Sequence, residues 1–216
     1  MAQIFHRSMN LLSRVSIYGA ILVVGALGYA LYALALSPWY TEQTMVRPQP
    51  VPFSHRHHAG ELGIDCRYCH SSVEKSSFAG LPPTQTCMTC HSQIWTNAAM
   101  LEPVRASYRD DTSLAWTRVN ALPDFVYFDH SIHVSKGIGC TTCHGKIADM
   151  ALTYRAGTLY MSWCLECHRQ PEKYVRPKSE VFNAFYEPPS NQIESGKKLV
   201  KEYDIQSLQH CSVCHR

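Results

Sequence analysis

The longest run of hydrophobic positions lies between Ile17 and Leu36, where twenty residues pass without a charged side chain. As a helix, about twenty apolar residues match the hydrocarbon thickness of a bilayer. Trp39 and Tyr40 follow the run, where aromatic side chains favour the interface between lipid and water. The pattern predicts a single transmembrane helix over residues 17–36.

A cleavable signal peptide is the main alternative, because Ala33-Leu34-Ala35 resembles a cleavage site. The apolar run is longer than the hydrophobic region of a usual signal peptide, which favours a retained anchor. Arg7 and Arg14 precede the run and favour a cytoplasmic N-terminus over residues 1–16, although two arginines beyond the run weaken this bias. We therefore expect the rest of the chain on the periplasmic side of the cytoplasmic membrane.

Beyond the anchor the chain shows no long amphipathic period. Closely spaced prolines predict an extended, Pro-rich spacer over residues 37–52. A short helix is expected over 92–104, extended chain over 113–128 and a modest helix over 195–203. After residue 168, four further prolines interrupt any long element. The pattern predicts short helices joined by irregular segments.

Aromatic, histidine and glycine positions repeat at an interval of about 75 residues. Phe53-x-His55-x-x-His58 recurs as Phe128-x-His130-x-x-His133, and Gly63-Ile64-Asp65-Cys66 recurs as Gly137-Ile138-Gly139-Cys140. Such self-similarity is typical of a duplicated structural unit. We therefore divide the chain after the spacer into module 1 over 53–91, a connector over 92–127, module 2 over 128–168 and a wrapping tail over 169–216.

Cys-x-x-Cys-His, the attachment signature of c-type haem, occurs five times and uses all ten cysteines. Two thiols one helical turn apart can form thioethers with the haem edge, and the adjoining His can become the proximal iron ligand. We expect five covalently bound haem c groups, attached through Cys66, Cys69, Cys87, Cys90, Cys140, Cys143, Cys164, Cys167, Cys211 and Cys214. The predicted proximal ligands are His70, His91, His144, His168 and His215.

Zinc and disulfide bonds explain the cysteines less well. Zinc ribbons need Cys-x-x-Cys units in pairs, and five units cannot all be paired. Disulfides suit an even number of cysteines outside the cytoplasm. Neither alternative explains why a His follows the second Cys every time.

A haem iron with one His ligand has a sixth position that can take a second His or a Met. Each module contains two attachment sites and begins with two spaced histidines. The repeat therefore predicts four distal ligands: His55, His58, His130 and His133. His57 has no counterpart in module 2, where Ile132 stands at its position, so we expect it at the surface or against a haem propionate.

Four distal histidines leave the fifth iron without an assigned ligand. Candidates are Met100, Met150, Met161 and His210, and a missing sixth ligand is a further alternative. A methionine thioether would raise the potential of that centre above its bis-histidine neighbours. Each methionine can equally fill a gap beside a porphyrin.

The charge distribution of the chain argues against nucleic acid as a partner. The formal net charge is +3, and the propionates of five haems would add about ten acidic groups and reverse its sign. The scattered Lys and Arg residues are better suited to propionates than to nucleic acid, since no basic block is present. The predicted fold is a single N-terminal transmembrane α-helix plus a multihaem cytochrome c domain, made mostly of short helices and irregular loops wrapped on five haems.

The His-x-x-His that precedes Cys-x-x-Cys-His resembles class III multihaem cytochromes. Longer strings resemble the pentahaem cytochrome c subunits of bacterial alternative complex III: FSHRHHAGELGIDCRYCH, LPPTQTCMTCHSQIWTNAAMLEPVR, LPDFVYFDHSIHVSKGIGCTTCHG and WCLECHRQPEKYVRP. This resemblance covers nearly the whole chain after the anchor. It implies five haem sites on the five motifs, and distal ligands at His55, His58, His130 and His133.

The resemblance also implies a role. Quinol would be oxidised in another membrane subunit, and electrons would arrive through an iron–sulfur subunit. They would leave through a monohaem cytochrome c, a soluble carrier or a terminal oxidase. The leading hypothesis is thus an electron-transfer subunit of a respiratory or photosynthetic quinol-oxidising complex, with membrane lipid as a further partner and no substrate chemistry of its own.

Two other functions share these features. A membrane-anchored multihaem quinol dehydrogenase would touch quinol itself, and Glu42 is the obvious proton acceptor near the membrane. A multihaem reductase would need a five-coordinate haem, for which the unassigned fifth iron is the only candidate.

Overall fold

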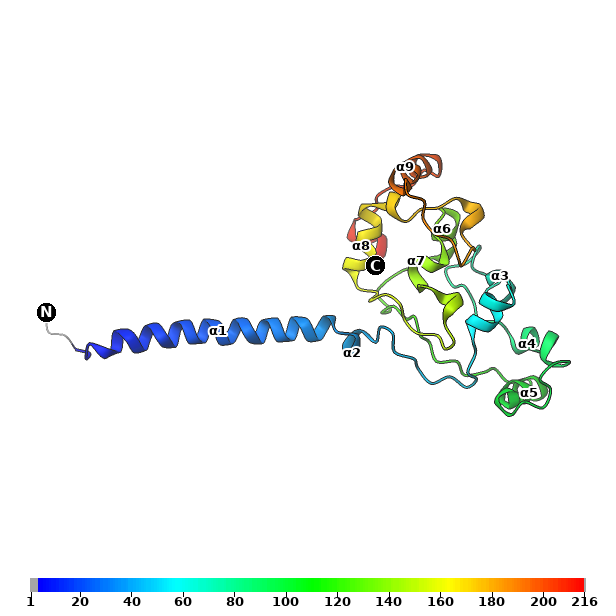
Figure 1. Ribbon diagram of the computed structural model, residues 1–216, viewed down its shortest axis with the longest axis horizontal. Helices are drawn as coiled ribbons and strands as arrows, with labels where there is room; N and C mark the ends of the chain where they lie inside the picture. Colours follow the sequence, from blue (N-terminus) through cyan, green and yellow to red (C-terminus); the bar gives the residue numbers. More distant parts are fainter. Residues whose placement is uncertain (1–3, 216) are drawn as a thin grey trace. The chain divides into compact units, whose positions relative to one another are not determined.

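The computed structural model describes residues 4–215, which divide into two compact units, residues 4–42 and 43–215. The first unit contains helix α1, Ser8–Leu36, followed by the single turn α2, Pro38–Thr41 (Figure 1). No residue of α1 is buried, and its mean hydropathy reaches 2.1. By length and composition, it is the one helix among residues 4–215 that could cross a membrane.

Helix α1 begins nine residues before the apolar run, so the helix extends into the segment expected as an N-terminal tail. The Ser8 hydroxyl bonds to His6 Nδ1 at 2.9 Å, and Ser13 and Ser16 donate to carbonyls of the preceding turn. The helix ends at Leu36 because Ser37 precedes Pro38, and a residue before proline disfavours helical dihedrals. The Ser37 side chain then accepts from the Tyr40 amide and caps α2.

The second unit consists of short helices and irregular segments, with isolated bridges in place of strands in its described part. Its α-helices are α3 Cys66–Cys69, α4 Thr84–His91, α5 Glu102–Arg109, α6 His130–Ser135, α7 Cys140–His144, α8 Met161–Arg169, α9 Gln192–Glu202 and α10 Cys211–Cys214. A π-helical turn, η1, covers Arg56–Glu61, and 3₁₀ turns cover η2 Ala99–Leu101, η3 Ile147–Asp149, η4 Pro171–Lys173 and η5 Lys178–Glu180.

The π-helical turn explains an irregularity in the sequence repeat. His58 lies eight residues before Cys66, whereas His133 lies seven residues before Cys140. In module 2 both histidines lie on an α-helix, α6, whereas in module 1 His55 is the N-cap of the wider turn η1 and His58 lies within it. A π-turn accommodates one extra residue without shifting the chain on either side of it. The insertion is therefore absorbed between the distal histidines and the first attachment site.

Residues 43–51 do not form a free spacer but pack against other parts of the second unit, which carries the attachment motifs and is called the haem-site unit from here on. The Thr44 amide donates to the Arg155 carbonyl at 2.9 Å, and Gln49 exchanges two hydrogen bonds with the Thr117 backbone. Val51 is buried in a small cluster with Leu101 and Val104. These residues hold the segment in place, so the spacer expected over 37–52 is largely part of the folded unit.

The connector differs from the expected helix over residues 92–104. Trp95 has a φ of +55°, which interrupts a helix, and α5 instead begins at Glu102. Pro103 lies in the first turn of α5, where its missing amide is tolerated and its fixed φ favours helix. Residues 113–128 contain no helix, as expected, and the helix expected over 195–203 is present as α9.

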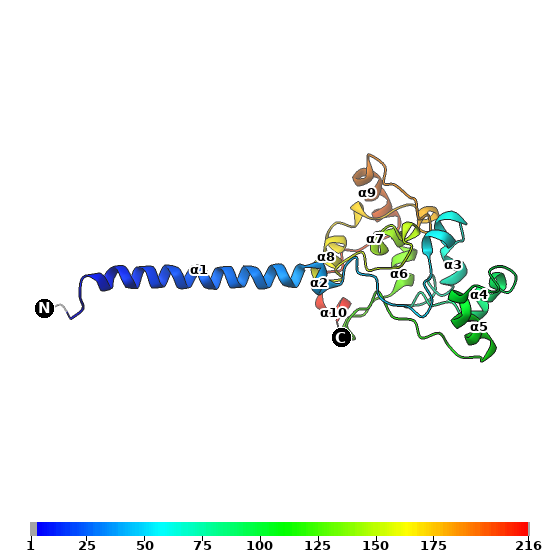
Figure 2. The same ribbon diagram turned by 60° about the horizontal axis from the view of Figure 1, so that its bottom comes forward.

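Helices α6 and α7 lie in the middle of this unit, with α3, α4 and α5 on one side and α8 and α10 on the other (Figures 1 and 2). The apolar core is small. Only eight hydrophobic side chains of the described residues are buried, while Phe78, Trp95 and Phe125 are each more than half exposed. The polypeptide thus supplies little of the close-packed interior that a soluble domain of this length requires.

Candidate haem sites

Each Cys-x-x-Cys-His motif lies on or at the end of a short helix, so its two cysteines are one turn apart. These helices are α3, α4, α7, α8 and α10. All ten cysteines are free thiols. Among residues 4–215, no group of three or more His, Cys, Asp or Glu side chains could hold a metal ion. The arrangement therefore offers thiols for covalent attachment and imidazoles in pairs.

Four of the motif histidines face one of the predicted distal histidines. The ring centres are 6.5 Å apart for His55 and His70, 6.2 Å for His58 and His91, 6.4 Å for His130 and His144, and 6.2 Å for His133 and His168. Two metal–nitrogen bonds of about 2 Å and the distances from nitrogen to ring centre on both sides add up to about 6 Å. The four pairs fit an iron between their rings.

Hydrogen bonds at Nδ1 orient these rings and leave Nε2 for a metal. His58 bonds to the Ser54 carbonyl at 2.8 Å, and His133 bonds to the Asp129 carbonyl at 2.7 Å. A ligating imidazole commonly donates its other N–H to such an acceptor, which fixes the tautomer. Four further paired histidines have an oxygen partner at Nδ1: Thr153 Oγ1 for His55, and the Gly80, Ile94 and Ser77 carbonyls for His70, His91 and His130. His144 differs, because its Nδ1 lies 3.3 Å from Asn120 Nδ2, an amide nitrogen that donates.

The two modules orient each other's histidines. His55 of module 1 bonds through Nδ1 to Thr153 Oγ1 of module 2 at 2.9 Å. His130 of module 2 bonds to the Ser77 carbonyl of module 1 at 2.8 Å. The sequence repeat did not reveal Thr153 or Ser77, because both lie between motifs, in stretches without repeated residues. Only the packing of one module on the other brings these partners together.

The ring orientations also repeat. His55 and His70 are nearly parallel, with an interplanar angle of 6°, and His130 and His144 are at 3°. The other two pairs are steeply inclined, at 66° and 69°. Phe53 stacks on His58 at 4.4 Å, and Phe128 stacks on His133 at 4.5 Å. The repeated Phe therefore fixes the ring of the second histidine in each module.

Burial keeps several of these imidazoles neutral. It lowers the pKa of His55 and of His144 to about 4, with a smaller contribution from neighbouring imidazoles, and it lowers the pKa of His133. A neutral imidazole has a free lone pair and can bind a metal. The environment thus favours the form that ligation needs.

Contacts between thiols show which attachment sites are neighbours. The Cys66 and Cys140 thiols lie close enough to shift each other's pKa, and the interaction together with burial raises the pKa of Cys140. Burial, and after it the charge of a neighbouring thiolate, raises the pKa of three further cysteines. The neighbour is Cys87 for Cys69, Cys167 and Cys164 for Cys143, and Cys214 for Cys164. The sites therefore form one row: 87–91, 66–70, 140–144, 164–168, 211–215. Figures 1 and 2 show α4, α3, α7 and α8 in this order, and Figure 2 shows α10 beside α8.

The fifth motif differs from the others. His215 Nδ1 bonds to the Phe125 carbonyl at 3.1 Å, and its ring stacks on Phe125 at 5.8 Å. Met161 begins α8, the helix whose Cys164 adjoins Cys214. Met150 is buried near Gly145, beside the third motif, and Met100 lies on η2 before α5. Of the three methionines, Met161 belongs to the element next to the fifth motif. His210 directly precedes Cys211 and N-caps α10.

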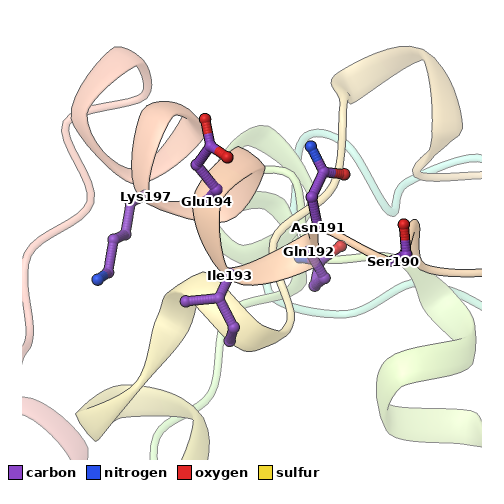
Figure 3. A pocket seen from close by; sticks show the side chains of 6 residues that line it. All are labelled: Ser190, Asn191, Gln192, Ile193, Glu194 and Lys197. Carbon is purple, nitrogen blue, oxygen red and sulfur yellow. The ribbon is translucent and has the colours of Figure 1, made fainter.

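The remaining histidines have other partners. His57 Nδ1 lies 2.8 Å from Glu61 Oε2, and its ring stacks on exposed Trp95 at 6.0 Å. His6 bonds to Ser8 on the N-terminal side of α1. The groove along α9, lined by Ser190, Asn191, Gln192, Ile193, Glu194 and Lys197, contains neither His nor Cys (Figure 3). This groove therefore offers no ligand for a haem.

Comparison with known proteins agrees with this geometry. Residues 37–115 match the class III cytochrome c family, and residues 126–216 match the family of cytochrome c7 and related cytochromes c. Each match contains two of the predicted distal histidines: His55 and His58 in the first, His130 and His133 in the second. These families carry covalently bound haem c, and the free thiol pairs and facing imidazoles fit that group.

The multiheme cytochrome c subunit of a menaquinone reductase from Nitratidesulfovibrio vulgaris is 32% identical over 143 aligned residues. The alignment takes in 56% of this chain and 68% of that relative. The similarity thus extends well beyond the attachment motifs themselves. This chain belongs to the multihaem c-type cytochromes of the class III and c7 type, which serve electron transfer.

Proposed function

We propose that this chain is the pentahaem electron-transfer subunit of a membrane-bound quinol-oxidising complex of the alternative complex III type. The observation that carries the proposal is the set of four histidine pairs whose ring centres lie 6.2–6.5 Å apart. Each pair joins one attachment motif to one distal histidine. Haem bound there would supply iron that cycles between ferric and ferrous states.

The proposed axial ligands follow these pairs. His55 with His70, His58 with His91, His130 with His144, and His133 with His168 would each ligate one iron. Met161 is our choice for the fifth site, where it would act together with His215, because α8 carries both Met161 and Cys164, the neighbour of Cys214. With two protein ligands, each iron would have no open position for a small molecule, so the residues around these sites would orient the ligands and exclude water rather than bind a substrate.

The row of attachment sites suits long-range electron transfer. Its ends are the second and the fifth motifs, and the first and third motifs lie side by side in the middle. An electron carrier can therefore dock at either end and reach the whole row. We propose an iron–sulfur subunit as donor and a monohaem cytochrome c, a soluble carrier or a terminal oxidase as acceptor.

Counting the haems tests the proposal directly. The intact mass of the chain, isolated from detergent-solubilised membranes and measured under denaturing conditions, is expected to exceed its polypeptide mass by five haem groups. An affinity tag on this chain should also retain an iron–sulfur subunit. A mass equal to that of the amino acids alone would contradict the haem assignment. Quinol oxidation by the isolated chain would instead favour a membrane-anchored quinol dehydrogenase.

A second candidate differs in the direction of electron flow. The relative from Nitratidesulfovibrio vulgaris is named as a subunit of a menaquinone reductase, a name that implies delivery of electrons to quinone. A complex containing this chain could work in the same direction. Two assays of the purified complex would show which reaction it supports: one supplies reduced cytochrome with a menaquinone analogue, and the other supplies quinol with oxidised cytochrome.

A third candidate is a multihaem reductase. Binding of cyanide to one oxidised haem would favour it.

Ring orientation predicts the paramagnetic resonance of the oxidised protein. Nearly perpendicular imidazoles leave two iron d orbitals close in energy, which gives a strongly anisotropic low-spin signal, whereas parallel imidazoles give an ordinary rhombic one. We expect two centres of each kind, plus a fifth with His/Met character. A redox titration followed at low temperature would count them. Four centres of a single type would contradict the pairing of parallel and inclined rings.

The proposed membrane anchor makes a further prediction. Leu22 lies near the middle of α1, where replacing it with Arg is expected to cost about 3 kcal/mol of insertion free energy. Alkaline carbonate extraction of the membranes should therefore release the L22R chain into the supernatant. Leu12→Arg, near the polar end of α1, is the matched control and should stay in the membrane. Equal retention of both variants would contradict a membrane-spanning role for the centre of α1.

A further inference from the structure

Arg176 is a buried cation beside the third attachment motif. Only 5% of its surface is exposed. Its Nη2 donates to Oγ1 of Thr141 at 3.0 Å and of Thr142 at 3.2 Å, the two residues between Cys140 and Cys143. The guanidinium also lies over the Tyr186 ring, 4.4 Å from its centre. The group is therefore fixed between α7 and Tyr186.

Within residues 4–215, no carboxylate pairs directly with this charge. Among the described residues, no Asp or Glu forms an ion pair with Arg176, and its buried Nε has no hydrogen-bond partner. Glu180 acts on it only from a distance and accepts instead from Asn183 Nδ2. Burial lowers the pKa of Arg176 from its ordinary value, but a guanidinium remains protonated in proteins. An unpaired charge in the interior is energetically unfavourable, so its place beside a haem-attachment helix indicates a role there.

The equivalent helix of module 1, α3, has no counterpart to this arrangement, in which the tail places a buried cation beside α7 of module 2. The position before the first Cys is Asp65 in module 1, where it forms an exposed ion pair with Arg67 at 2.8 Å. In module 2 the same positions are Gly139 and Thr141, which are uncharged. A Cβ on Gly139 would collide with the Arg176 guanidinium carbon. Gly139 thus provides the space that the cation occupies.

We propose that Arg176 raises the reduction potential of the haem attached at Cys140 and Cys143 above that of the haem attached at Cys66 and Cys69. An oxidised haem iron carries one more positive charge than a reduced one. A fixed cation in a low-dielectric surrounding therefore disfavours the oxidised state, and the effect is larger where water does not screen it. The ion pair of Asp65 with Arg67 is exposed and brings no net charge to the equivalent position.

This inference rests on the proposed haem sites and concerns the middle of the row. The first and third motifs adjoin each other through Cys66 and Cys140. Two otherwise similar sites, both with nearly parallel imidazoles, would thereby differ in potential. The difference would make the haem attached at Cys140 and Cys143 the more readily reduced of the two. Electron flow between the modules would then have a preferred direction.

Spectroelectrochemical titration of the intact complex tests the role of Arg176. Arg176→Gln should lower the midpoint of one centre and leave the other midpoints in place. Arg176→Lys keeps the charge and should largely restore that midpoint. Arg67→Gln, which removes an exposed cation at the equivalent helix of module 1, is the matched control and should cause the smaller shift.

Several outcomes would overturn the inference. One is an unchanged set of midpoints in Arg176→Gln with all haems present by intact mass. Another is an equal shift in the Lys and Gln variants, which would indicate packing rather than charge. If Arg176→Gln loses haem, Gly139→Ala provides the test, because its Cβ displaces the guanidinium; an unchanged midpoint there would refute the role. Absence of haem at this motif in the unaltered protein would instead refute the proposed function.

Discussion

Serine in place of both Cys140 and Cys143 is expected to remove one covalent haem and to block electron transfer between the two ends of the row. The third motif lies between the first and the fourth, as the thiol neighbours of Cys140 and Cys143 show. The rate of electron transfer falls steeply with the distance between two centres. A missing haem in the middle therefore separates the row into two parts. Bound haem should fall by about one fifth, one of five signature motifs being lost.

The matched control removes a motif at the end of the row. Serine at Cys211 and Cys214 should cost the same amount of haem, because both variants lose one attachment site. It should shorten the row without dividing it, so electrons supplied by dithionite-reduced donor still equilibrate among the remaining four centres. Stopped-flow reduction of the complex, monitored at the haem absorption bands, distinguishes the two. Equal kinetics in both variants would contradict the proposed order of sites.

Replacing His133 with Met is expected to have the largest effect on a single potential. His133 faces His168 with ring centres 6.2 Å apart and an interplanar angle of 69°. A thioether in that position favours ferrous iron, so the midpoint should rise on the order of 100 mV, well within the roughly 0.8 V over which axial ligands move haem potentials. One strongly anisotropic low-spin signal should disappear at the same time.

His57 supplies the control for this experiment. It lies next to His58 in sequence but is paired with Glu61 rather than with a motif histidine. His57→Met should leave every midpoint and every low-spin signal in place. A comparable shift in both variants, or no shift with His133→Met, would show that His133 is not an axial ligand. The haem content of each variant, measured by intact mass, confirms that all sites are still occupied.

Much of the candidate site could be predicted because its chemistry is local. Cys-x-x-Cys-His joins two thiols and an imidazole within five residues, and a single helical turn suffices to present them. The internal repeat predicted His55, His58, His130 and His133 as distal ligands without any knowledge of the fold. Chain distance alone could not reveal which of them faces which motif, since His58 lies nearer in sequence to His70 than to its partner His91.

Sequence alone was less informative about the connecting segments. Pro103 was expected inside the end of a helix, whereas it begins one, because proline at the start of a helix loses no hydrogen bond. Residues 43–51 were expected as a spacer on the strength of their prolines. Their attachment depends on Thr117 and Arg155, which lie far along the chain and carry no signal in the segment itself.

The amino-acid sequence by itself determined the apolar helix, the five attachment motifs and the histidines that repeat with them, since each depends on residues close together in the chain. Tertiary structure alone decided the pairing of rings, the succession of sites along the row, the hydrogen bonds of Thr153 and Ser77 between modules, and the burial of Arg176 over Gly139. The physical reason is that these features arise from contacts between residues far apart in sequence, which form only when the two modules and the tail pack together.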